Sequence, residues 1–386
     1  MREHPFPHGF FCFLKGLMDM EPFYALALPQ GDEANYQREI LSCTVFRHLA
    51  LAVKAAGGKA FLAGAETMGE RMTQEDFFAM VCGNKALLLL APVAALSGET
   101  LSRLVAQEEC AVLMAGKLPL ALWGQEEELK ALDLAALPEG IARVQAAPGE
   151  GLPALDPEST YAVQEQLRRS INYRWMQKGV MLVDPNTTHI SPEAELAPGC
   201  TILPGCLIYG ESKVAAGALI GPNALLRDAA IGEGTTVNMS QVNESTVGAH
   251  TTVGPFAYIR PNCHIGDHVR IGDFVELKNS AIDDETKVSH LTYIGDTDLG
   301  KRINVGCGVV TVNYDGKKKY RTTVGDDCFV GCNVNLISPV NIGSGSYLAA
   351  GGTITEDVPE ESFVIARARQ TVKPEWVKKR KQAGKL

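Results

Sequence analysis

A six-residue period dominates the second half of the sequence. Aliphatic residues recur at steps of six from Ile190 to Leu226, continue with occasional steps of five to Val305, and return from Val324 to Ile354. Neither a helix of 3.6 residues per turn nor a strand with alternating side chains gives this spacing. It is typical of a parallel β-helix, in which each short strand points one aliphatic side chain inward and successive coils stack about 4.8 Å apart.

The period is interrupted once, at "TVNYDGKKKYRTT", residues 311–323. This stretch carries too many charged and polar side chains to face an aliphatic interior, because burying an unpaired charge costs free energy. The sequence therefore predicts a loop that leaves the β-helix between two coils.

Several polar residues lie at or beside the aliphatic positions of successive hexads. They are Arg260, Lys278, His290, Tyr293 and Asn304. Stacked coils would bring such residues together along one edge, where they could line a groove. Periodicity alone leaves an alternative open, which is that they are scattered surface charges, and a lone histidine such as His290 is more often a packing residue than a proton carrier.

From "INYRWMQKGVMLVDP" at 171–185 to "VIARARQ" at 364–370, the sequence resembles the acetyltransferase half of the bifunctional N-acetylglucosamine-1-phosphate uridyltransferase and glucosamine-1-phosphate N-acetyltransferase family. Its most specific motifs are "GPFAYIRP", "GDFVELK", "SHLTYIGD", "NVGCGVVTVNYDGKKK" and "IARARQ". The resemblance implies a left-handed β-helix, a homotrimer with active sites between subunits, and acetyl-CoA as co-substrate. The implied acceptor is glucosamine 1-phosphate, for UDP-N-acetylglucosamine and peptidoglycan synthesis.

The resemblance also implies roles for individual residues. The catalytic base is His290, because a neutral imidazole can take a proton from an amine. The cations that hold the sugar phosphate are Arg260, Lys278 and Lys319, and the sugar contacts are Tyr293 and Asn304. The acetyl-CoA contacts are Asn313, Tyr314, Cys332, Ala350 and Arg367, with Cys307 as a small residue that lets the cofactor pass. No magnesium site is expected.

The first half predicts an α/β domain. Residues 23–65 read as strand, loop, helix and strand, and the stretch that begins at Lys85 repeats the scheme. These elements resemble a Rossmann-like nucleotidyltransferase domain, but Asp32 and Glu33 stand where its loop binds phosphates. Pro92 and Leu155 stand at its two magnesium-ligand positions. We therefore predict a shortened domain without uridyltransferase activity; an unrelated α/β domain with its own ligand is the alternative.

The chain of 386 residues is longer than one hydrophobic core usually organises. The predicted parts are an N-terminal extension (1–20), the degenerate nucleotidyltransferase-like domain (21–155), a linker helix (156–180), the β-helix (181–365) and a basic tail (366–386). A net charge of −9 disfavours nucleic acid as a partner. The sequence has no apolar run long enough to span a membrane. Its ten cysteines form no CxxC pair, which favours a cytoplasmic protein with reduced thiols.

The sequence leaves two other functions open. One is acetyl transfer to a different amino sugar or to a nucleotide amino sugar. The other is a non-catalytic partner of a full-length bifunctional enzyme, which would keep the hexads but has no need of His290, Asn313 and Arg367 together.

Overall fold

The computed structural model describes residues 23–28, 34–63, 70–134 and 136–385. The predicted extension at 1–20 and the acidic pair Asp32 and Glu33 lie outside these residues. The chain divides into two compact units. The first unit comprises Met1–Lys178, Pro185–Ala194 and Ile208–Gly210, and the second comprises Gly179–Asp184, Glu195–Leu207 and Glu211–Leu386.

A seven-stranded sheet forms the centre of the first unit, in the order β5-β4-β1-β6-β8-β7-β9. Its strands are β1 (Phe23–Ala27), β4 (Gly58–Ala63), β5 (Arg71–Met72), β6 (Lys85–Leu89), β7 (Ala111–Ala115), β8 (Leu118–Gln125) and β9 (Ala142–Gln145). The strands from β5 to β6 are parallel, and β8 runs antiparallel to β6 and β7. The first unit is thus an α/β domain with a mixed sheet, as the sequence predicts.

The first unit also contains helices and one small two-stranded sheet. They are α2 (Ala34–Gln37), β2 (Glu39–Ile40), β3 (Cys43–Thr44), α3 (Val45–Ala55), α4 (Gln74–Val81), α5 (Gly98–Val105), α6 (Glu126–Ala131) and α7 (Pro157–Gln177). Helix α7 begins with a capping box between Asp156 and Ser159 and with proline at its first position. It lies within the range expected for the linker helix.

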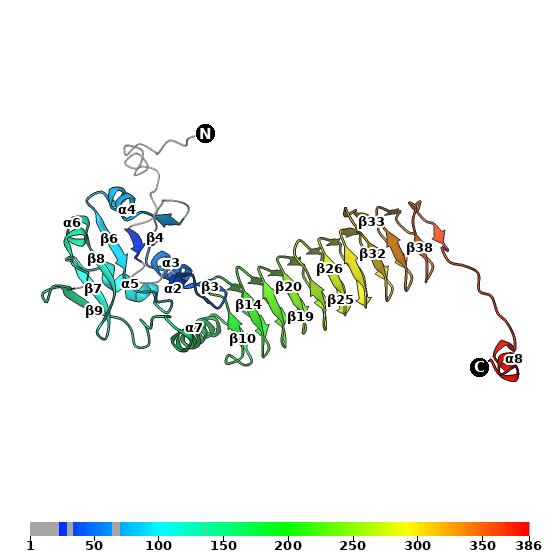
Figure 1. Ribbon diagram of the computed structural model, residues 1–386, viewed down its shortest axis with the longest axis horizontal. Coiled ribbons are helices and arrows are strands. Elements are labelled where there is room, and N and C mark those ends of the chain that lie inside the picture. The colour runs from blue at the N-terminus through cyan, green and yellow to red at the C-terminus, as the bar shows by residue number, and fades with distance from the viewer. Residues whose placement is uncertain (1–22, 29–33, 64–69, 135, 386) are drawn as a thin grey trace, which may run out of the picture. The chain divides into compact units, whose positions relative to one another are not determined.

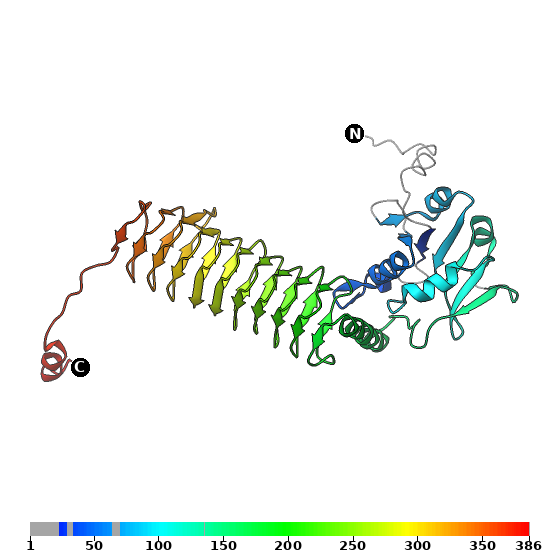
Figure 2. The same ribbon diagram turned by 180° about the vertical axis from the view of Figure 1, so that it is seen from behind.

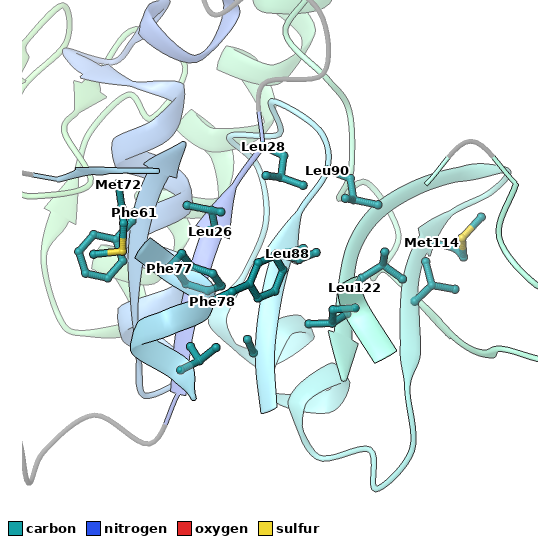
Figure 3. Close-up of a cluster of buried hydrophobic side chains, with 14 residues drawn as sticks. Leu26, Leu28, Phe61, Met72, Phe77, Phe78, Leu88, Leu90, Met114 and Leu122 are labelled. Atoms are coloured by element: carbon teal, nitrogen blue, oxygen red, sulfur yellow. The ribbon is translucent and has the colours of Figure 1, made fainter. Parts of the chain in front are cut away.

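Alternating side chains of the central strands fill the core of the first unit (Figure 3). Leu26 and Leu88 pack with Phe77 and Phe78 of α4 on one face of the sheet. Ala25, Leu87 and Leu89 alternate with them in sequence and are completely buried too. Because successive side chains of a strand point to opposite faces, both faces of this sheet are covered.

Three parallel sheets build a left-handed β-helix (Figures 1 and 2). The 11-stranded sheet contains β10 (Met181–Leu182), β13 (Thr201–Ile202), β16 (Leu219–Ile220), β19 (Thr236–Val237), β22 (Thr252–Val253), β25 (Arg270–Asp273), β28 (Lys287–His290), β31 (Asn304–Val305), β34 (Phe329–Val330), β37 (Tyr347–Leu348) and β39 (Phe363–Val364). The 10-stranded sheet contains β11 (His189–Ile190), β14 (Leu207–Tyr209), β17 (Leu225–Arg227), β20 (Gln241–Asn243), β23 (Tyr258–Ile259), β26 (Glu276–Lys278), β29 (Tyr293–Gly295), β32 (Val310–Val312), β35 (Asn335–Ile337) and β38 (Thr353–Ile354). The 9-stranded sheet contains β12 (Glu195–Leu196), β15 (Lys213–Val214), β18 (Ala230–Ile231), β21 (Thr246–Val247), β24 (His264–Ile265), β27 (Ala281–Ile282), β30 (Thr297–Leu299), β33 (Thr322–Val324) and β36 (Asn341–Ile342).

The aliphatic residues of the period point into the β-helix. Ile259, Leu277 and Ile294 occupy neighbouring strands of one sheet and are fully buried. The predicted loop is also present, because β32 ends at Val312 and β33 begins at Thr322. Beyond the last coil, the basic tail carries a short exposed helix, α8 (Trp376–Gln382). Across the described ranges, no helix is both long and apolar enough to cross a membrane.

Candidate active site

Four neighbouring strands of the 10-stranded sheet place polar residues at one corner of the β-helix. These strands are β23, β26, β29 and β32, which follow one another in the sheet. Lys278 ends β26 and pairs in register with Gly295, the last residue of β29. Arg260, Asp296 and Asn313 directly follow the other three strands. Arg260 and Lys278 are therefore level with each other, Asp296 stands one residue beyond the register partner of Lys278, and all four residues lie where their strands end.

Three cations meet at this corner. The pKa of Lys278 is lowered, first by the adjacent ammonium of Lys319, then by partial burial and by Arg260. Lys278 Nζ lies 3.8 Å from Asp296 Oδ2, and Arg260 Nη1 lies 2.9 Å from Glu276 Oε1. The neighbouring cations lower the pKa of Lys278 even though Asp296 and Glu276 lie nearby, so the corner suits an anion.

Asp296 connects the corner to the loop. This residue is 7% exposed, and its two carboxylate oxygens accept hydrogen bonds of 2.5 Å from Asn279 Nδ2 and Asn313 Nδ2. Burial raises the pKa of Asp296, but these two hydrogen bonds and the nearby Lys278 and Lys319 outweigh burial, so the pKa is lowered overall. Asp296 is therefore ionised at neutral pH and holds the first residue of the loop.

Hydrogen bonds within the loop at 313–321 define its conformation. Tyr320 N donates to Asn313 O at 2.9 Å, and Tyr314 pairs with Lys319 in an isolated bridge. Asp315 Oδ1 accepts hydrogen bonds of 2.7 Å from the backbone N–H groups of Lys317 and Lys318. These bonds fold the loop tightly and present Lys319 beside Lys278.

Tyr293 lies next to the same corner. A Cβ added at Gly295 would lie 2.3 Å from Tyr293 Oη and 2.8 Å from Asn313 Nδ2, so both polar groups converge on this glycine. Asn304 belongs to the 11-stranded sheet instead, where it pairs in register with Lys287 of β28. Of the two predicted sugar contacts, only Tyr293 therefore approaches the Asp296 corner directly.

His290 ends strand β28 and meets Asp273, which ends the neighbouring strand β25. The two residues are register partners, and His290 Nδ1 lies 2.5 Å from Asp273 Oδ1. This hydrogen bond is the main reason why the pKa of Asp273 is lowered. The histidine side chain is 59% exposed, so its ring is available to a ligand rather than packed in the interior.

The predicted acetyl-CoA contacts separate into two groups. Cys307 O accepts from Asn333 N, and Cys332 O accepts from Gly351 N, so Cys307, Cys332 and Ala350 occupy equivalent positions on successive coils. Arg367 joins them, because a Cβ added at Gly351 would contact its Cδ at 3.7 Å. Asn313 and Tyr314 lie with Lys319 in the loop. Asn313 is buried and already donates to Asp296.

Sequence reasoning missed Asp273 and Asp296. Asp273 precedes His290 by 17 residues, which is one coil containing a step of five. Asp296 follows Lys278 by 18 residues, one more than the 17 that separate Lys278 from its register partner Gly295. Comparing each candidate with the residues one coil away would therefore have found both carboxylates.

The first unit contains Pro92 and Leu155. Pro92 is buried and its carbonyl accepts from Ala154 N, whereas the side chain of Leu155 is exposed. Neither side chain has an atom that binds a metal. Within the described ranges, no group of three or more histidine, cysteine, aspartate or glutamate side chains is arranged to hold a metal ion.

Comparison with known proteins identifies relatives of part of the chain. Residues 244–279 match the family described as bacterial transferase hexapeptide (six repeats). The chain is 50% identical over 226 residues to the bifunctional protein GlmU of Thermoanaerobacter pseudethanolicus, which covers 58% of this chain and 50% of that protein. It is 56% identical over 216 residues to the bifunctional protein GlmU of Oceanobacillus iheyensis, which covers 56% of this chain and 48% of that protein.

Solved structures add only a weak likeness. UDP-N-acetylglucosamine acyltransferase from Campylobacter jejuni matches 45% of this chain and 71% of that chain with 16% identity and a TM-score of 0.32. The chain spans about half the length of the curated relatives it matches. Over that shared length, with its hexapeptide repeats and the motifs around His290, the chain resembles the bifunctional protein GlmU.

Proposed function

We propose that the second unit transfers the acetyl group of acetyl-CoA to the amine of glucosamine 1-phosphate. The product is N-acetylglucosamine 1-phosphate, a precursor of UDP-N-acetylglucosamine and peptidoglycan. The cluster of Lys278, Lys319 and Arg260 carries this proposal, because two adjacent ammonium groups beside a guanidinium suit a dianionic phosphate. A neutral sugar would leave these cations with no counter-charge beyond Asp296 and Glu276.

His290 would act as the general base. The amine of the sugar is protonated in water and becomes nucleophilic when His290 takes its proton. The nitrogen lone pair then forms a bond to the thioester carbon, and the carbon–sulfur bond breaks. The thiolate of coenzyme A leaves and takes the second proton that the nitrogen loses, which gives the thiol and the neutral amide. A positioned base of this kind accelerates such a step by roughly 10²–10⁴.

Acetyl-CoA would bind along the column formed by Cys307, Cys332 and Ala350. The short side chains of these residues leave room for an extended chain, and the exposed guanidinium of Arg367 suits its phosphates. The loop residues Asn313 and Tyr314 would reach the cofactor from the neighbouring corner, with the Asn313 side chain acting through its bond to Asp296. Tyr293 and Asn304 would contact the sugar.

Exposed apolar side chains beside His290 support a homotrimer. Phe256, Phe274 and Leu291 are 49%, 57% and 57% exposed, and the rings of Phe256 and Phe274 stack with their centroids 5.4 Å apart. Phe274 directly follows Asp273, and Leu291 directly follows His290. Neighbouring copies would cover this strip, because exposed apolar patches of this kind mark association surfaces.

The first unit would have lost uridylyl transfer. Residues 21–155 would be a degenerate nucleotidyltransferase-like domain and 156–180 its linker helix, followed by the acetyltransferase at 181–365 and a basic tail at 366–386. Pro92 and Leu155 cannot bind the magnesium ion that phosphoryl transfer needs. The cytoplasm supplies both small-molecule substrates, so we place the protein there.

One assay separates these possibilities. Release of the coenzyme A thiol is measured with glucosamine 1-phosphate, glucosamine and UDP-glucosamine as acceptors. Preference for glucosamine 1-phosphate supports the proposal, and preference for UDP-glucosamine supports a nucleotide amino sugar instead. Thiol release with none of the acceptors would favour a non-catalytic partner of a bifunctional enzyme.

A further inference from the structure

The contact between Asp273 and His290 determines which atom of the histidine can act as the base. We propose that Asp273 is a positioning residue that keeps the proton of the neutral imidazole on Nδ1 and leaves Nε2 as the atom that removes the proton of the acceptor amine. The kinetic consequence of this inference rests on the proposed acetyl transfer. The assignment of the ring proton rests on the contact between Nδ1 and the carboxylate, independently of any activity.

Hydrogen bonds hold the backbone at both Asp273 and His290. Asp273 and His290 end adjacent parallel strands as register partners, and Leu291 N donates to Asp273 O at 3.0 Å. The carbonyl of His290 accepts from Thr292 Oγ1 at 2.6 Å. Because the backbone is held on each side of the pair, only side-chain conformational entropy is lost when the two groups meet.

A glycine permits the close approach of the two strands. A Cβ added at Gly272, directly before Asp273, would lie 1.9 Å from Ser289 O, directly before His290. No larger residue fits this position without moving the two coils apart. The motif "GDFVELK" therefore contributes both the glycine that brings the strands together and the carboxylate that meets the imidazole.

The chemistry of the two groups then assigns the proton. The pKa of Asp273 is lowered by its hydrogen bond from His290, so this carboxylate is ionised at neutral pH and can only accept hydrogen bonds. Nδ1 lies 2.5 Å from the carboxylate and must donate. A neutral imidazole has one donor and one acceptor nitrogen, so Nε2 carries the lone pair.

The same contact assists the reaction step. When Nε2 takes the amine proton, the ring becomes an imidazolium, and the carboxylate at Nδ1 stabilises the new positive charge. A buried aspartate in this role contributes about 10⁴ in kcat in serine proteases. Asp273 is 36% exposed, so solvent screening reduces its effect, and we expect a loss of about 10- to 100-fold in kcat without it.

The kinetic experiment compares Asp273→Ala with a matched control, Asp327→Asn. Asp327 accepts from Arg302 at another corner and has no part in the proposed site. We expect Asp273→Ala to lower kcat with little change in the KM for acetyl-CoA, and formate to restore part of the lost rate by replacing the carboxylate. Formate should not restore activity to His290→Ala. If Asp273→Ala keeps kcat within twofold of the unmodified protein, Asp273 is not a positioning residue.

A second measurement is independent of activity. Long-range ¹H–¹⁵N NMR of histidine-labelled full-length protein reports which ring nitrogen carries the proton, and His290→Gln identifies the signal. We expect the Nδ1–H tautomer in the unmodified protein and a mixture in Asp273→Ala. The Nε2–H tautomer in the unmodified protein would overturn the assignment, whereas a fixed Nδ1–H tautomer without acetyl transfer would contradict only the proposed function.

Discussion

Replacing Asp296 with asparagine should loosen the loop at 313–321. The carboxylate of Asp296 accepts from the amide groups of both Asn279 and Asn313. An asparagine at this position has only one oxygen, so its own NH₂ group would face one of these two donors. One hydrogen bond to a charged group is lost at a buried site, which costs about 1.5–3 kcal/mol.

The lost interaction should appear as easier opening of the loop. Asn313 begins the loop, Tyr320 N closes it onto Asn313 O, and Thr322 N donates to Asp296 O. A cost of about 1.5–3 kcal/mol raises the population of the open loop by about 10- to 150-fold. At a low protease concentration, the cleavage rate follows that population.

Native-state trypsin digestion measures this opening, because the loop contains Lys317, Lys318, Lys319 and Arg321. The fragment cleaved within the loop is quantified by mass spectrometry for Asp296→Asn and for the control Asp327→Asn. The control removes an exposed ion pair with Arg302, which contributes little to stability. Equal loop cleavage rates for Asp296→Asn and the unmodified protein would show that Asp296 does not hold the loop.

Three further predictions follow from the same geometry. Lys278→Met should raise the KM for glucosamine 1-phosphate about 10- to 100-fold while the affinity for acetyl-CoA, measured by calorimetry, stays unchanged; an unchanged KM would remove Lys278 from the phosphate site. Sedimentation analysis should give a trimer, and a stable active monomer would rule out shared sites. UTP and N-acetylglucosamine 1-phosphate with magnesium should yield no pyrophosphate above background, because neither Pro92 nor Leu155 has a side-chain atom that binds a metal; measurable pyrophosphate would refute this.

The repetitive part of the fold could be predicted from the sequence because each hexad contains the aliphatic residue that points into the β-helix. Ile259 and Leu277 are buried where the period puts them, and the polar loop leaves the β-helix after Val312. Local spacing suffices here, since each coil packs only against its neighbours.

The partners of the site residues could not be predicted in the same way. Whether His290 meets a residue 17 or 18 positions earlier depends on whether a corner uses five or six residues, and Gly272 then decides how closely the strands approach. Asn313 was expected to contact the cofactor, but its side-chain direction depends on Asp296, one coil earlier. Such contacts between coils are set by side-chain direction, which periodicity does not specify.

The substitution His290→Ala tests the central claim most directly. The matched control is His268→Ala, another exposed histidine of the β-helix, whose ring stacks on His250 with a centroid distance of 5.2 Å. We expect His290→Ala to lower turnover of glucosamine 1-phosphate at least about 100-fold while acetyl-CoA binding and the fold are kept, and His268→Ala to behave like the unmodified protein. Turnover by His290→Ala within a few-fold of the unmodified protein would contradict the assignment of His290 as the catalytic base.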